Sequence, residues 1–142
     1  MHTKQNLGVE LANETGVDAS GNGSSKGLAI LGGGGVVFQL RVTAAAALST
    51  DKLDVTVQST IDGSNWFDVA AFTQVAGDAT PPVSLGQKVQ TAKNESSVLD
   101  LTATISAGSK IDFCGNLFRA KWTITDVSAP SFDFTVHAAA MP

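Results

Sequence analysis

The strongest pattern in the chain is a pair of hydrophobic–polar alternations between residues 117 and 138, separated by a short loop of Asp, Ser and Pro. The apolar positions are Phe118, Ala120, Trp122 and Ile124 in the first stretch and Phe132, Phe134, Val136 and Ala138 in the second. Such a period of two is typical of strands with one buried face. Arg119 and Lys121 alternate with the first set, and Asp133 and His137 with the second. The pattern predicts a β-hairpin with one buried face and one hydrated face that carries opposite charges across the pair.

Further alternations of the same kind occur at residues 36–43, 53–58 and 99–105. After the second of them, residues 62–65 (Asp-Gly-Ser-Asn) supply the residue types that tolerate the backbone of a tight turn. We therefore expect a second hairpin, in which residues 66–73 form the return strand.

The return strand carries aromatic residues on both faces. Phe67, Val69 and Ala71 form one face, while Trp66 and Phe72 fall on the other. Either a β-bulge turns part of this strand so that Trp66 or Phe72 also points inward, or the two rings are left outside for a partner. The bulge is favoured, since Trp is more often buried for packing than exposed for binding.

Two segments interrupt the strand pattern. Residues 1–27 combine a weak alternation at Leu7, Val9 and Leu11 with a Gly/Ser/Asn-rich stretch, and are predicted to be a flexible N-terminal arm. The remainder, 28–142, is predicted to be one β-sandwich domain that folds without the arm. Residues 74–97 read as a long loop, of the kind that is functional or carries a short edge strand.

Seven or eight short strands with turn signals between them and no helical interlude predict an all-β protein. We expect a single antiparallel β-sandwich of jelly-roll or related Greek-key type.

Composition and charge exclude several classes of function. The 142 residues have a net charge of -4, which provides no broad positive field for nucleic acid or anionic lipid. No apolar run approaches the length of a membrane span, and the first residues lack the apolar segment of an export signal. A lone Cys114 fits a protein made in a reducing cytoplasm, where it serves as a small buried hydrophobe. We expect neither nucleic acid nor a membrane as partner.

Catalytic and cofactor chemistry finds no support in the residues. The two histidines, His2 and His137, lack the partners of a triad, and His137 is expected to be a solvated imidazole facing the same way as Arg119 and Lys121. One Cys and two distant His cannot supply a structural zinc site, and no calcium loop is present. The Gly-rich run at 21–26 has Lys26 where a dinucleotide-binding motif needs its third Gly, and the run at 32–35 is not followed by the helix that a phosphate site needs. We predict no catalytic, metal or cofactor-binding residues and no enzymatic activity.

Two segments of the chain resemble small β-sandwich proteins encoded among the structural genes of tailed bacteriophages. The first runs from Leu53 to Val75 and contains Val55-Thr-Val-Gln-Ser-Thr-Ile-Asp-Gly-Ser-Asn-Trp66. The second runs from Phe118-Arg-Ala-Lys-Trp-Thr to Ser131-Phe-Asp-Phe-Thr-Val136. The Gly-Asn-Gly-Ser-Ser stretch and residues 36–43 share the likeness. The chain departs from the family pattern at Ala129, inserted before Pro130, and in its length around 94–97.

The resemblance implies a virion structural protein without enzymatic activity. It is expected to be a capsid decoration or cement protein, made in the host cytoplasm, that binds the outside of an assembled phage head and stabilises it. Its partners would be the major capsid protein and copies of itself, as a homo-oligomer for which a trimer suits local threefold positions. The alternatives are a phage tail or baseplate component and, in a different class, a carbohydrate-binding module that stacks sugars on Trp66; an enzyme ranks last.

The predicted partner-binding residues are Leu7, Val9 and Leu11 of the arm together with Trp66 and Phe72 of the return strand. In the arm, extended backbone would order against neighbouring subunits.

Overall fold

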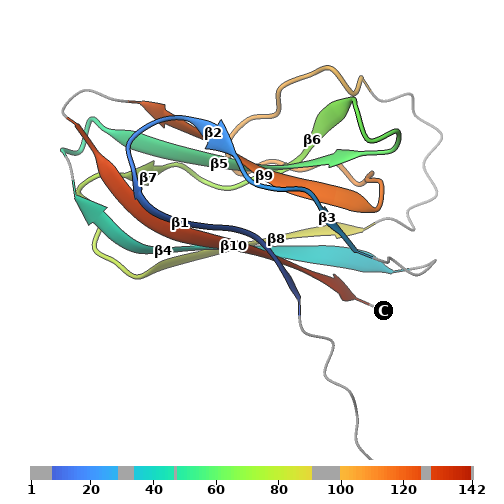
Figure 1. The fold of residues 1–142 in the computed structure, drawn as a ribbon, viewed down its shortest axis with the longest axis horizontal. Helices are drawn as coiled ribbons and strands as arrows, with labels where there is room; N and C mark the ends of the chain where they lie inside the picture. Colours follow the sequence, from blue (N-terminus) through green and yellow to red (C-terminus); the bar gives the residue numbers. More distant parts are fainter. Residues whose placement is uncertain (1–7, 29–33, 47, 91–99, 126–128, 142) are drawn as a thin grey trace, which may run out of the picture.

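The computed structural model describes residues 8–28, 34–46, 48–90, 100–125 and 129–141, in which all regular secondary structure is β-strand. The strands are β1 (Val9–Val17), β2 (Gly21–Asn22), β3 (Lys26–Gly27), β4 (Gly35–Ala46), β5 (Lys52–Thr60), β6 (Trp66–Ala71), β7 (Val75–Ala76), β8 (Val83–Gln90), β9 (Leu117–Thr125) and β10 (Ser131–Met141). Figure 1 shows them in two layers. The described ranges contain no helical segment that could span a bilayer.

Each layer is one antiparallel sheet. Sheet A has the order β1-β10-β4-β8, and sheet B has the order β2-β9-β5-β6, with the short β3 beside β9 and β7 beside β5. All the pairings within both sheets are antiparallel. The predicted all-β antiparallel sandwich is confirmed.

The strand pairs are nested around the β5–β6 hairpin. Moving outward along the chain, β4 pairs with β8, then β2 and β3 pair with β9, and finally β1 pairs with β10. Successive pairs alternate between sheet B and sheet A. The chain is therefore wound as one long hairpin folded across the two facing sheets.

The core lies between the inner faces of the two sheets, where the alternating apolar positions meet. Phe38 of β4 packs edge-on against Phe118 of β9, with ring centroids 5.5 Å apart, and Trp122 of β9 packs against Phe134 of β10 at 5.4 Å. Trp122 is 6% exposed, and its Nε1 donates a hydrogen bond to the Ala19 carbonyl at 3.1 Å. Edge-on aromatic pairs of this kind bury large apolar areas and fix how the sheets face each other.

The strands within residues 117–138 form as predicted, but the predicted hairpin is wrong. β9 lies between β5 and β2 in sheet B, whereas β10 lies between β1 and β4 in sheet A. Both apolar faces point into one core, so a period of two fits either arrangement. The polar faces consequently lie on opposite outer sides of the molecule, and Arg119 and Lys121 do not face Asp133 or His137.

The hairpin around residues 62–65 and its bulge are confirmed. The register passes from Val57 opposite Ala70 to Gln58 opposite Asp68, which leaves Val69 as the extra residue of the return strand. Beyond the shift the chain turns Phe72 inward, where it is 1% exposed.

Residues 8–27 belong to the sandwich, in contrast to the predicted flexible arm and its domain boundary. β1 pairs with β10 along the edge of sheet A and buries Leu11, which is 2% exposed. Gly23 donates its backbone N–H to Ala120 at 2.8 Å, and a Cβ at Gly23 would lie only 2.4 Å from the Leu11 carbonyl oxygen. Glycine in this stretch therefore permits a close backbone approach, a use that composition does not separate from flexibility. Residues 1–7, with Leu7, lie outside the described residues.

The region from 74 to 105 differs from the predicted pattern in its second half. The expected edge strand is β8, which pairs with β4 over residues 83–90 and forms one edge of sheet A. The predicted strand at 99–105 is wrong over the described positions, because residues 100–105 lie in turn and irregular backbone. There the Asp100 carboxylate accepts hydrogen bonds from the backbone N–H and the hydroxyl of Thr102, at 2.9 and 2.6 Å. This local bonding competes with strand pairing.

Candidate partner-binding site

Of the predicted partner-binding residues, Trp66 is the one that the structure places on an outer face of the sandwich. Leu11 and Phe72 are core residues, at 2% and 1% exposed, so their assignment to a partner is wrong. Val9 is partly buried and packs against the same core. Leu7 lies outside the described residues.

Trp66 begins β6 and is partly exposed on the outer side of sheet B. Its neighbour across β5 is Arg119 of β9, whose guanidinium carbon lies 4.4 Å from the centre of the Trp66 ring. A guanidinium over an indole face is a favourable cation–π contact, and Trp is the best of the aromatic partners. The two side chains thus form a stacked pair built from strands 53 residues apart in sequence, counted from 66 to 119.

A chain of hydrogen bonds fixes the orientation of the guanidinium. Arg119 Nε donates to Gln58 Oε1 at 2.9 Å, and Gln58 Nε2 donates to Asp68 Oδ1 at 2.9 Å. Asp68 Oδ2 accepts from the Ile105 backbone N–H at 3.3 Å. Gln58 and Asp68 are 7% and 9% exposed, so water competes little for these bonds and each member holds the next in place.

The covering segment, residues 100–112, explains why outward-facing polar residues are buried. It runs beside β6 on the outer side of sheet B (Figure 1). Its backbone pairs with the free edge of β6 through Ala71 N–H to Ser109 O and Ile111 N–H to Val69 O, both at 2.8 Å. The segment thereby closes an open sheet edge and shields the hydrogen-bond chain that ends on Arg119.

Beside the stacked pair lies a hollow of about 640 Å³ between the β5–β6 turn and the covering segment. Its walls combine apolar and polar side chains, among them Ile61, Asp62, Asn65, Trp66, Leu101 and Arg119. Ile61 is 66% exposed, which is unusual for a large apolar side chain. Protein interfaces likewise combine apolar and polar side chains.

The carboxylate on the turn side of this hollow is held by its own turn. Asp62 Oδ1 accepts hydrogen bonds from the backbone N–H groups of Ser64 and Asn65, at 2.9 and 2.8 Å, and from the Thr60 hydroxyl at 3.1 Å. The bond from the Asn65 N–H is the largest of the causes that hold the pKa of Asp62 well below its ordinary value. Asp62 is therefore an ionised and rigid group, with most of its acceptor capacity already used.

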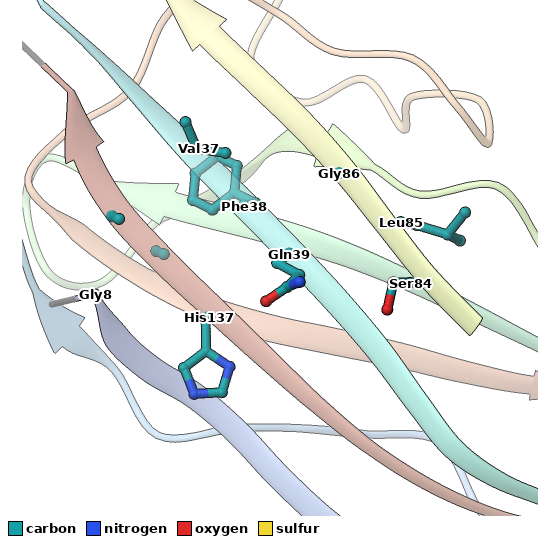
Figure 2. A pocket seen from close by; sticks show the side chains of 10 residues that line it. Gly8, Val37, Phe38, Gln39, Ser84, Leu85, Gly86 and His137 are labelled. Atoms are coloured by element: carbon teal, nitrogen blue, oxygen red, sulfur yellow. The ribbon is translucent and has the colours of Figure 1, made fainter. Parts of the chain in front are cut away.

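A second hollow, of about 550 Å³, lies on the outer face of sheet A (Figure 2). Figure 2 shows His137 and Gln39 standing beside it, with Leu85 directed away from them and Gly86 leaving the middle of β8 without a side chain. His137 Nε2 lies 3.5 Å from Glu10 Oε2 on β1, and its side chain is 41% exposed. The predicted solvated imidazole is consistent with this placement, although its neighbour is Glu10 and not Arg119 or Lys121.

Among residues 8–28, 34–46, 48–90, 100–125 and 129–141, no group of three or more His, Cys, Asp or Glu side chains could hold a metal ion. Cys114 is partly buried, and desolvation raises its pKa to about 11, so it is a protonated thiol at neutral pH.

Sequence reasoning found Trp66 but missed the residues that make its surroundings a site. The alternation predicts a hydrated face for Arg119. Nothing local in the sequence indicates that β5 and β9 are neighbours in the register that brings Gln58 opposite Arg119. Burial of Asp68 depends on the covering segment, and the pattern predicts a strand over the first part of that segment, at 99–105. Comparison of the chain with protein-family models, curated proteins and solved structures found no match.

Proposed function

We propose that this chain is a non-enzymatic structural protein of a phage virion, a capsid decoration or cement protein that binds the outside of the assembled head and stabilises it. It works as a rigid two-sheet body that docks through surface side chains. Its partners are the major capsid protein and further copies of itself.

The proposal is supported first by where the resembling segments lie in the fold. The segment 53–75 spans most of β5 and all of β6, and the segment 118–136 supplies most of β9 and much of β10. β5, β9 and β10 are interior strands of their sheets. The likeness to phage structural proteins thus concerns the residues that build the sandwich.

The observation that carries a docking role is the hollow beside Trp66 and Arg119. Trp and Arg are the residue types most often found as energetic anchors of protein interfaces. Here they are stacked on each other, next to the exposed Ile61. A protein with such a surface is suited to bind, as an added subunit, to a preformed shell.

The test is binding to shells that lack this protein. We expect the purified protein to bind them from the outside with a fixed stoichiometry to the shell protein, and to raise the temperature at which they rupture. Imaging by electron microscopy would show the site, and sedimentation analysis of the free protein would give its oligomeric state, for which we propose a trimer. Absence of the protein from purified heads would contradict the proposal.

Two alternatives give different results in the same experiments. A tail or baseplate component would be recovered in particles but located away from the head. A carbohydrate-binding module would use Trp66 as its stacking platform, and the polar groups around the hollow favour that reading. One face of the Trp66 ring is already occupied by Arg119, which leaves a sugar only the other.

A further inference from the structure

Arg119 is prepared to bind a ligand that the described residues do not supply. Its Nε is taken by Gln58 and its plane is stacked on Trp66, but within the described ranges its terminal nitrogens have no hydrogen-bond partner. A guanidinium presents these N–H groups in a planar fork that matches a carboxylate. Because the fork is held in place before any ligand arrives, little side-chain entropy remains to be lost on binding.

The surroundings of Arg119 select among anions. Asp62 lines the same hollow as an ionised carboxylate, so the site holds one positive and one negative group. A singly charged carboxylate meets less repulsion there than a phosphate, which carries more charge. The net charge of -4 adds no long-range attraction for a polyanion.

The apolar wall of the hollow selects what must accompany the carboxylate. Ile61 is 66% exposed and Trp66 is partly exposed, so a ligand that buries them gains from the hydrophobic effect. A carboxylate beside an apolar side chain is what an Asp or Glu in a protein loop presents. A small anion without an apolar group would leave Ile61 and Trp66 exposed to water.

We propose that Arg119, oriented by Trp66 and Gln58, binds an Asp or Glu carboxylate of the protein partner, and that the neighbouring apolar residue of that partner covers Ile61. The inference rests on the proposed function, since it names the surface through which the subunit meets the shell. Gln58 and Asp68 act as positioning residues, because they reach the ligand only through Arg119.

The first arm of the test uses acetate as the carboxylate probe and does not involve shells. Sodium acetate is titrated against the protein at constant ionic strength, with chloride as the reference anion, while NMR follows the Arg119 Nε–H and the two indole N–H signals. We expect a saturable shift of Arg119 and Trp66, with the buried Trp122 indole unmoved, and Trp66→Phe assigns the indole signals. Absence of a shift, or an equal shift with chloride, would overturn the carboxylate site.

The second arm measures shell binding by three variants that are first shown to melt like the wild type. Arg119→Gln is expected to weaken binding roughly tenfold to hundredfold, as for the loss of one charge-assisted contact. Arg119→Lys should also weaken it, because an ammonium keeps the charge but loses the fork and the stack. The matched control is Lys121→Gln, which removes the same charge from the next outward position of β9 and should leave binding within about twofold of wild type.

The two arms separate the inference from the proposed function. Equal weakening by Arg119→Gln and Lys121→Gln would mean general electrostatics and would overturn the site. A saturable acetate shift in a protein that binds no shells keeps the carboxylate site and overturns its docking role together with the proposed function. If glucuronate saturates the shift at a concentration about tenfold lower than acetate, the ligand is an acidic sugar and the assignment to a protein partner is wrong.

Discussion

At the scale of single residues, the two tryptophans show how one residue type takes opposite roles. Trp122 closes the core and donates its indole hydrogen to Ala19, whereas Trp66 lies outside beneath a guanidinium. Alternation alone assigned Trp122 correctly, because its strand has one apolar face. Trp66 belongs to a strand that carries aromatic residues on both faces. The alternation therefore does not decide whether Trp66 or Phe72 enters the core, and the bulge at Val69 does.

We expect Trp122→Ala to lower the free energy of unfolding by about 3–5 kcal/mol, the usual cost of emptying a large aromatic site in a core. Urea denaturation followed by circular dichroism measures this loss. Lys121→Ala, on the exposed side of the same strand, is the control and should stay within about 0.5 kcal/mol of wild type. A small loss for Trp122→Ala would contradict the packing against Phe134.

Asp62 provides a pH test of the turn. Its pKa is lowered in the folded protein from the ordinary value of 3.8, so its ionised form adds stability above pH 3.8 that is lost as the pH falls toward the folded value. Asp62→Ala should therefore be less stable than wild type at neutral pH, and the difference should narrow below pH 3.8. Unfolding curves of wild type and Asp62→Ala over that pH range measure the difference, with the exposed Asp18→Ala as control. If the turn did not hold the carboxylate, the stabilities of wild type and Asp62→Ala would not converge at low pH.

At the scale of strands, the sequence predicts which residues form strands better than which strands pair. The period of two marks inward positions equally well for a hairpin and for two strands on facing sheets, so β9 and β10 were found but joined wrongly. The failure at 100–105 has another cause, because apolar residues in turns can mimic a strand by spacing alone. The prediction of a flexible arm over residues 8–27 is wrong because composition cannot distinguish two uses of glycine. A glycine that permits a close backbone contact, such as Gly23, looks the same in the sequence as one that permits motion.

Two glycines distinguish close approach from open space. Gly23→Ala would place a Cβ 2.4 Å from the Leu11 carbonyl, a backbone atom that cannot move without disturbing β1, and we expect a loss of about 1–3 kcal/mol. At Gly86 the nearest atom to a Cβ is 3.9 Å away, so Gly86→Ala should be neutral or slightly stabilising. Thermal unfolding compares the two variants, and equal effects would show that Gly23 does not lie against β1.

Removing the N-terminal segment tests whether it is part of the fold. A variant without residues 1–27 loses β1, β2 and β3 and with them Leu11 from the core, and we expect its cooperative melt to be lost or shifted far down. Deleting one buried Leu alone costs about 2–5 kcal/mol, a large part of a typical domain stability of about 5–15 kcal/mol. A variant without residues 1–7 is the comparison. A normal melt after removal of residues 1–27 would contradict this prediction and support a flexible arm.

At the scale of the whole molecule, nested pairing makes most of the contacts distant in sequence. The outermost pair joins Val9 to Ala138, and even interior neighbours such as β4 and β10 are about ninety residues apart, with Val42 opposite Phe134. Contacts of this kind require closing long loops before they stabilise anything.

We therefore expect refolding in about milliseconds to seconds, as for other proteins dominated by non-local strand pairing. Stopped-flow dilution from urea, followed by the fluorescence change of the two tryptophans, measures the rate. Folding in microseconds would mean that local structure leads, which is contrary to this topology. The innermost hairpin, β5–β6, is the element most able to form early.

The position of β10 has a consequence for biosynthesis. β10 lies inside sheet A, between β1 and β4, although of the described strands it leaves the ribosome last. Until residues 131–141 emerge, β1 and β4 lack the strand that pairs with both of them. Each then has an open edge with which another chain could pair. A message cut short before codon 131 thus yields a chain that cannot close sheet A. A polypeptide must include residues 131–141 before its sheet A is complete.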